Sequence, residues 1–213
     1  MVEIKNIEKE IASNLLKIEA IKLSPENPFT WSSGWNSPIY CDNRVSLSYP
    51  ELRNLIKKGF AEKIMEKFPN VEVIAGVATA GISHGALIAD ELNLPFTYVR
   101  PEPKKHGAGK QIEGQTPEGK NVVVIEDLIS TGGSSLKAID ALRKANCNVL
   151  GMAAIFTYGF PHADENLKNA NVPYLTLSNY STMIEEAIET GYIKPEDKEM
   201  LENWRKDPSN WGK

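Results

Sequence analysis

The chain has 213 residues, of which 41% are hydrophobic and 24% are charged, and its formal net charge is −4 at pH 7. This length and composition are typical of one globular α/β domain with a full hydrophobic core. The acidic balance argues against non-specific nucleic-acid binding, and no apolar run approaches the length of a membrane span. The charged N-terminus lacks the apolar core of a signal peptide, and Cys41 and Cys147 lack the spacing of a disulfide framework or a zinc site. We therefore expect a cytoplasmic protein that binds neither nucleic acid nor a membrane.

Helical and strand patterns alternate along the chain. An amphipathic helix is predicted over 4–21, short strands and turns over 28–49, and a second helix from Pro50 to about Phe68. The remaining pattern predicts strands at 71–77, 95–99, 122–125, 148–156 and 174–178, and helices at 82–92, 136–145, 181–189 and 196–206. This order implies a mostly parallel central sheet with helices on both faces. We interpret residues 1–49 as a small N-terminal hood on a core of residues 50–213, within a single domain.

Three loops should leave the carboxyl ends of the predicted strands, where ligands bind in sheets of this kind. They are Ala78–Gly81, Arg100–Lys120 and Asp127–Ser135. The second has too few apolar residues to belong to the core, and it gathers several cations in an acidic chain. We expect it to be an exposed loop that closes over an anionic ligand. The single histidine of the helix at 82–92, His84, is interpreted as a packing residue, and residues 162–165 as a surface turn.

The most informative stretch is 122–135, VVVIEDLISTGGSS. It predicts a buried strand, an acidic pair, a loop of hydroxyls and glycines, and a helix N-terminus whose N–H groups suit a phosphate. A Walker A loop is excluded because Ser134 follows Gly133 directly, and the dinucleotide GxGxxG pattern is absent. The alternative is a plain corner at which a hydroxyl caps the helix, which accounts for only one of the four hydroxyl residues.

The pattern of 122–135 resembles the phosphoribosyl-diphosphate (PRPP) motif of the type I phosphoribosyltransferases. Together with FTWSSGWNSPIYCDNR, GVATAGI and YVRPEPKKHGAGKQIEG, in that order along the chain, it is similar to the orotate phosphoribosyltransferase family. The resemblance covers roughly residues 15–160. It implies a type I phosphoribosyltransferase fold and the transfer of the 5-phosphoribosyl group from PRPP to orotate, which yields orotidine 5′-monophosphate for pyrimidine (UMP) synthesis.

The resemblance also implies roles for individual residues. Lys104, Glu126 and Asp127 would be catalytic, and Ser32, Tyr40 and Ser130 would contact orotate. The residues implied to bind PRPP are Arg100, Lys104, His106, Glu126, Asp127, Leu128, Ile129, Ser130, Thr131, Gly132, Gly133 and Ser134. Mg²⁺ would accompany the diphosphate, with no dedicated protein ligands. The enzyme would be a homodimer in which the loop of one subunit, through Arg100, Lys104 and His106, reaches the active site of the other.

Four positions depart from the family pattern. Many members carry lysines where this chain has Ser32, Ala80 and Pro101, and some carry an arginine where it has Tyr158. The remaining loop cations must then carry more of the charge. Two alternatives stay open: a type I phosphoribosyltransferase for a purine base, and a PRPP-sensing regulator without catalytic activity. The aromatic segment 28–44 favours orotate over a purine, and the acidic balance and the retained loop cations argue against a regulator.

Overall fold

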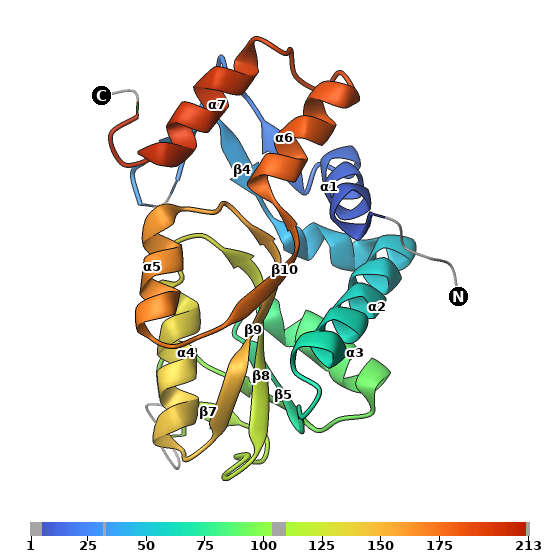
Figure 1. The fold of residues 1–213 in the computed structure, drawn as a ribbon, viewed down its shortest axis with the longest axis vertical. Helices are drawn as coiled ribbons and strands as arrows, with labels where there is room; N and C mark the ends of the chain where they lie inside the picture. The colour runs from blue at the N-terminus through green and yellow to red at the C-terminus, as the bar shows by residue number, and fades with distance from the viewer. Residues whose placement is uncertain (1–5, 32, 104–109, 212–213) are drawn as a thin grey trace.

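The computed structural model describes residues 6–31, 33–103 and 110–211. Its centre is a six-stranded sheet in the order β10-β9-β8-β5-β6-β7 (Figure 1). Five of these strands are parallel, and β7 pairs antiparallel with β6 at one edge. The strands are β5 (Val73–Val77), β6 (Phe96–Val99), β7 (Ile112–Glu113), β8 (Asn121–Ile129), β9 (Asn148–Thr157) and β10 (Tyr174–Asn179).

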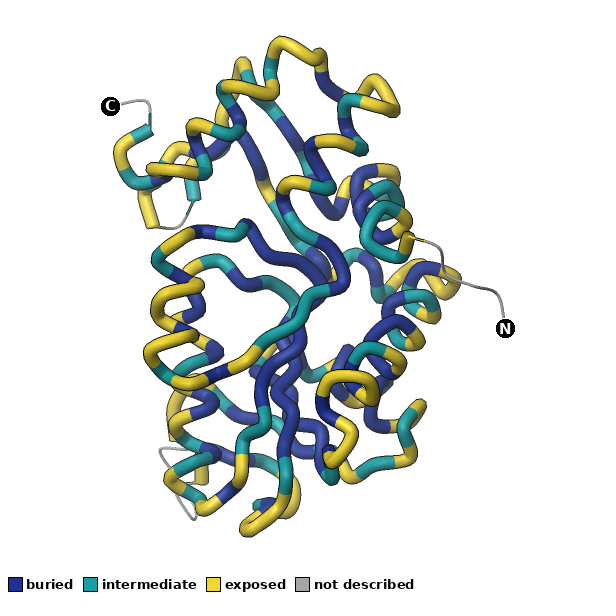
Figure 2. The backbone as a smooth tube through the Cα atoms, viewed as in Figure 1, coloured by how far each residue is buried: buried dark blue, intermediate teal, exposed yellow. Residues whose placement is uncertain are grey.

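Helices cover both faces of the sheet, as the sequence predicts. In Figure 1, α2 (Pro50–Lys67) and α3 (Ala80–Leu92) lie on one side, and α4 (Gly133–Lys144) and α5 (Pro161–Asn169) on the other. The strands between them are buried along almost their whole length (Figure 2). Within the described parts of the chain, no helix is both long and apolar enough to span a bilayer.

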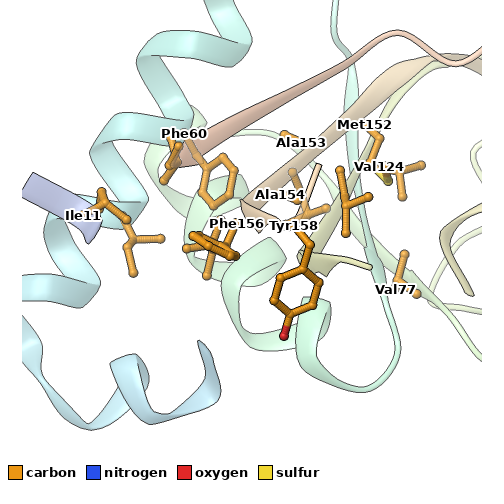
Figure 3. Close-up of a cluster of buried hydrophobic side chains, with 14 of the residues drawn as sticks. Ile11, Phe60, Val77, Val124, Met152, Ala153, Ala154, Phe156 and Tyr158 are labelled. Atoms are coloured by element: carbon orange, nitrogen blue, oxygen red, sulfur yellow. The ribbon is translucent and has the colours of Figure 1, made fainter. Parts of the chain in front are cut away.

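The core forms where helix and strand patterns meet. Helix α2 begins with Pro50 at its first turn and directs Ile56, Phe60 and Ile64 inward at helical spacing. These side chains are almost completely buried, and burial of each such side chain contributes about 1.5–3 kcal/mol. Phe60 packs in one cluster with Phe156 and the side chains of the central strands (Figure 3).

The strand order creates a switch point between β5 and β8. Strand β5 connects through α3 to β6 on one side, whereas β8 connects through α4 to β9 on the other. The two connections diverge beyond the carboxyl ends of β5 and β8, which leaves a crevice for a ligand. Glycines keep this region tight: a Cβ at Gly76 would lie 2.6 Å from the carbonyl oxygen of Gly81, and a Cβ at Gly81 would collide with that of Ile125.

The hood combines segments from both ends of the chain. Strand β1 (Ile21–Leu23) pairs antiparallel with β4 (Ile39–Cys41), β2 (Phe29–Thr30) pairs with β3 (Asn36–Ser37), and the 3-10 helix η1 (Asn43–Ser48) follows. Two C-terminal helices, α6 (Tyr180–Glu189) and α7 (Asp197–Lys206), complete this end of the molecule (Figure 1). The indole N–H of Trp204 in α7 donates to the carbonyl of Asn36 at 3.2 Å. The hood therefore depends on residues far outside 1–49.

Several predicted boundaries were wrong. Helix α1 spans only Ile7–Lys17, because Glu19 adopts a positive φ of 57° and the chain turns into β1. The stretch 100–120 is not one long loop, because Ile112 is buried and β7 forms there. Strand β8 continues through the acidic pair to Ile129. Residues 162–165 belong to α5, which Pro161 starts, and do not form a surface turn.

Candidate active site

The acidic pair, Glu126 and Asp127, lies near the carboxyl end of β8, at the crevice. Glu126 is 5% exposed, and its carboxylate accepts from the N–H of Asp127 at 3.1 Å and from the hydroxyl of Ser135 at 3.3 Å. Burial and the neighbouring Asp127 carboxylate raise the pKa of Glu126 to about 8. Burial also raises the pKa of Asp127, whereas the nearby Arg44 guanidinium opposes this shift. Burial therefore favours the protonated form of both carboxyls, most strongly at the more deeply buried Glu126.

The loop after β8 presents a helix N-terminus without a side-chain cap. Gly132 occupies the N-cap position of α4 with a φ of 78°, and no side chain accepts a hydrogen bond from the first turn. The hydroxyls of Ser134 and Ser135 instead contact the Glu126 carboxylate, at 3.4 and 3.3 Å. The plain-corner alternative, in which a hydroxyl caps the helix, is therefore wrong. The first N–H groups of α4 are available to an anion.

A cavity of about 520 Å³ lies between the hood and the end of β8; we call it the hood cavity. Tyr40 and Ser130, two of the three residues expected to contact orotate, both line it. Ser32 lies outside the described residues, but its neighbours Trp31 and Ser33 are in the wall. The described lining is aromatic and polar and contains no cationic side chain: Thr30, Trp31, Ser33, Trp35, Tyr40, Cys41, Leu128, Ser130, Thr131 and Tyr158.

A second cavity of about 340 Å³ lies between the end of β5 and the start of α4; we call it the loop cavity. Arg100, Gly133 and Ser134, all expected to bind PRPP, line it together with Ala78. The guanidinium of Arg100 is held by Glu113 at 3.4 Å across the β6–β7 pairing. The predicted residues Lys104 and His106 lie outside the described residues.

A hydrogen-bond chain ties the hood to the acidic strand. The side-chain amide of the fully buried Asn43 donates to the carbonyl oxygen of Asp127 at 2.8 Å. The oxygen of the same amide accepts from the thiol of Cys41 at 3.4 Å. Since Asp127 is half-buried and lies next to this link, the hood helps to fix the position of the acid at the crevice.

The β8–α4 corner brings most of the predicted site residues together, but not all of their side chains face a cavity. The side chain of Ile129 is buried in the core, and its carbonyl oxygen accepts from the N–H of Tyr158. His84, interpreted as a packing residue, is buried in α3 and lines neither cavity. Burial lowers the pKa of His84 to about 4, so it is neutral at physiological pH.

Several residues that line these cavities are not among the predicted site residues, and three of them are Trp31, Lys137 and Tyr158. Trp31 belongs to the predicted aromatic segment, and Lys137 belongs to the predicted helix 136–145. Lys137 lies one turn into α4 and faces the loop cavity, so i, i+4 spacing from Gly133 could have identified it. Tyr158 follows β9 directly, and the rule that ligands bind beyond carboxyl strand ends applies to it as well.

The described residues contain no cluster of three or more side chains suited to hold a metal ion. Mg²⁺ commonly binds through one or two carboxylates, several waters and the phosphates of a substrate. Glu102, which lines the loop cavity, and the half-buried Asp127 of β8 are carboxylates that suit this mode of binding, and a dedicated protein cage is not required.

The fold agrees with comparisons to known proteins. A model of the phosphoribosyl transferase domain matches residues 48–192. The crystal structure of orotate phosphoribosyltransferase from Aeropyrum pernix superposes with a TM-score of 0.75 at 30% identity, covering 86% of this chain and 99% of that chain. The architecture and the site thus define a type I phosphoribosyltransferase fold.

Comparison with curated relatives identifies the family within the type I phosphoribosyltransferases. The orotate phosphoribosyltransferase of Bacteroides thetaiotaomicron is 58% identical over 97% of this chain and 98% of its own length. The orotate phosphoribosyltransferase of Streptococcus pneumoniae serotype 19F is also 58% identical, over 95% of this chain and 97% of its own. The chain belongs to the orotate phosphoribosyltransferase family.

Proposed function

We propose that the protein transfers the 5-phosphoribosyl group of PRPP to N1 of orotate, releasing diphosphate and forming orotidine 5′-monophosphate for UMP synthesis. One observation carries the proposal: two cavities flank a phosphate-binding corner and an acidic pair at the switch point of the sheet. The crevice offers a separate surface for the 5′-phosphate of PRPP, for its diphosphate and for the orotate base. The names of the close relatives support the same activity.

The 5′-phosphate of PRPP is assigned to the N-terminus of α4. The uncapped N–H groups and the positive end of the helix dipole favour an anion there. The acidic pair then lies beside the ribose, where Asp127 can accept hydrogen bonds from the ribose hydroxyls. The Glu126 carboxylate accepts hydrogen bonds from the hydroxyls of Ser134 and Ser135 and so helps to hold the first turn of α4 in place.

The diphosphate is assigned to the loop cavity. Arg100 and Lys137 both line it, and two cations at this site offset the absence of lysine at Ala80 and Pro101. Lys104 and His106 of the second subunit are proposed to add further charge. When bound, Mg²⁺ would neutralise the diphosphate charge and stabilise it as a leaving group, with Glu102 as a carboxylate in the lining of the loop cavity.

The reaction is a displacement at C1 of the ribose. The bond from C1 to the diphosphate oxygen breaks, and the electron pair leaves with the diphosphate. A bond forms from N1 of orotate to C1, and the proton of N1 is released to the departing diphosphate or to water. Positive charge develops on the ribose ring as the bond breaks. The Asp127 carboxylate is half-buried beside the ring, where the low dielectric strengthens its attraction to that charge.

We further propose that the active enzyme is a cytoplasmic homodimer whose active sites are shared. The basis is the resemblance, which assigns Arg100, Lys104 and His106 to the active site of the other subunit. Because Arg100 lines the loop cavity of its own subunit, we propose the shared role for Lys104 and His106. The two ends of this segment are held together by the β6–β7 pairing and by the side chain of Gln111, which donates to the carbonyl of Arg100 at 2.9 Å.

The activity can be tested by the loss of orotate absorbance after addition of PRPP and Mg²⁺. Hypoxanthine, adenine and uracil serve as competing bases. We expect orotate to be consumed far faster than any of the three. Equal or faster turnover of hypoxanthine would instead support a purine phosphoribosyltransferase, and absence of any turnover with retained PRPP binding would support a regulator.

A further inference from the structure

Tyr158 has an unusually constrained ring. It follows β9 directly, and its side chain is 2% exposed. The centroid of its ring lies 5.2 Å from that of Trp31 and 5.3 Å from that of Phe160, and three more aromatic rings surround it at 5.9–6.5 Å: Phe156, Tyr180 and Trp204. Contacts of this kind leave the ring little freedom to change rotamer, so they fix the position of its hydroxyl.

The hydroxyl of Tyr158 has no hydrogen-bond partner among the described residues. Figure 3 shows the hydroxyl pointing away from the labelled hydrophobic side chains. Tyr158 lines the hood cavity, which makes its hydroxyl the polar side-chain group that this residue can offer to a ligand there.

The surroundings of Tyr158 keep its hydroxyl neutral. Burial, with Cys41, Tyr180 and Asp127 nearby, raises the pKa of Tyr158 well above its ordinary value. A neutral phenol is a hydrogen-bond donor. A phenol at a cavity wall that makes no hydrogen bond to the described residues is therefore available to donate to a ligand.

The hood cavity needs such a donor. Orotate presents an anionic carboxylate and two ring carbonyls, yet the described lining offers no cation to them. At the position where some relatives are expected to carry an arginine, this chain has Tyr158. We propose that Tyr158 is a base-recognition residue, whose fixed hydroxyl donates a hydrogen bond to an exocyclic oxygen of orotate. This inference rests on the proposed function.

The chain offers a matched pair of variants to test this role, Tyr158→Phe and Tyr180→Phe. Both tyrosines are buried in the same aromatic cluster, but the hydroxyl of Tyr180 already donates to the carbonyl of Leu201 at 3.0 Å and does not line the cavity. Each variant keeps the ring and removes one hydroxyl, so both should fold. The measured quantities are kcat, KM for orotate, KM for PRPP and the melting temperature without ligand.

For Tyr158→Phe we expect KM for orotate to rise about tenfold, with kcat and KM for PRPP within about twofold of wild type, because a binding interaction is lost and the PRPP contacts remain. Its melting temperature should stay close to that of wild type, since the hydroxyl makes no hydrogen bond to the described residues. Tyr180→Phe should melt lower and leave KM for orotate unchanged.

An unchanged KM for orotate in Tyr158→Phe would overturn the inference, as would an equal rise in Tyr180→Phe, which would indicate a purely structural effect. Either result in an enzyme that consumes orotate leaves the proposed function standing. Failure of the wild-type protein to consume orotate is the separate result that would reject the proposed function itself.

Discussion

Glu126 and Asp127 are neighbours in the chain, yet their carboxyl groups meet different surroundings. Alternation along β8 turns Glu126 inward to the serines of α4 and leaves Asp127 half-buried at the crevice. One carboxyl is therefore positioned to retain a proton and support the corner, while the other faces the site with its charge. This division of roles follows from the strand geometry and does not depend on a bound ligand.

The first prediction concerns the charge of Asp127. Asp127→Asn keeps the size of the side chain and removes the carboxylate that faces the ribose in the proposed complex. We expect kcat/KM for PRPP to fall by about two orders of magnitude, equivalent to roughly 3 kcal/mol of transition-state stabilisation. Thermal melting should change little, because the side chain lies at a strand end. A folded variant with full activity would show that this acid is structural only.

The second prediction concerns pH and Glu126. The pKa of about 8 in the folded protein exceeds the ordinary value of 4.5, so the folded state holds a proton that the unfolded chain releases. This contribution to stability is complete below pH 4.5 and is lost as the pH rises toward 8. The Glu126→Gln variant has no carboxyl group at this position and therefore lacks this pH-dependent contribution. The free energy of unfolding of the variant, relative to that of wild type, should therefore rise by up to about 1.4 kcal/mol per pH unit between pH 5 and 8.

Urea unfolding at intervals from pH 5 to 9 measures this difference. The exposed Glu62→Gln on α2 is the control, and its stability should follow that of wild type across the range. Parallel curves for wild type and Glu126→Gln would contradict the assigned proton and show that Glu126 is ionised in the folded protein.

At the scale of elements, strong periodic patterns predicted the structure well. The apolar run 122–125, the helix from Pro50 and the strands near 73, 96, 148 and 174 all form within a few residues of their predicted bounds. The sheet class followed from their order, since parallel strands require crossovers. The predicted ligand edge also contains both cavities.

Elements set by tertiary contacts were not predictable in the same way. Strand β7 has only two residues, and it forms because Ile112 is buried and the β6 edge is available. Helix α5 has a polar sequence with two buried side chains, Ala163 and Leu167, too few for a clear periodic signal. The role of Trp31 depends on Trp204, which is distant in the chain and carries no local signal.

The third prediction tests the tight approach of α3 to the crevice. A Cβ at Gly81 would collide with the backbone carbonyl of Ile125, whereas a Cβ at Gly133 would meet nothing closer than the Thr131 hydroxyl at 3.8 Å. Gly81→Ala should therefore lower the free energy of unfolding by about 1–3 kcal/mol. Gly133→Ala, also at the start of a helix, should be neutral or slightly stabilising.

Urea midpoints and slopes of the two variants give this comparison directly. If Gly81→Ala were as stable as Gly133→Ala, α3 would have room to move away from β8. The packing of α3 against the end of β8 would then be looser than the structure indicates.

At the scale of the whole molecule, both ends of the chain build one wall of the site. The hood strands supply Trp31 and Tyr40, the C-terminal helix α7 supports Trp31 through Trp204, and Asn43 joins the hood to β8. The base-binding wall is therefore connected to the acidic strand by direct contacts. A proposed second subunit would complete the site from the side of the loop cavity.

The fourth prediction tests the shared active site. Lys104→Ala and Asp127→Asn are each expected to be inactive, and the two proteins are refolded together. Random pairing makes about half of the dimers mixed, and each mixed dimer regains one intact site of two, so about a quarter of wild-type activity should return. Differently tagged subunits verify that mixed dimers form. No recovery in their presence would mean that each loop serves its own subunit.

The central claim is that one nucleotide spans the switch point, with its phosphate at α4 and its base in the hood cavity. A crystal structure of the protein with orotidine 5′-monophosphate tests this claim most directly. We predict the 5′-phosphate at the N–H groups of the first turn of α4, the ribose beside Asp127, and the base against Tyr40 and Tyr158. A base bound in the loop cavity, or a nucleotide bound away from the β5–β8 crevice, would contradict the account.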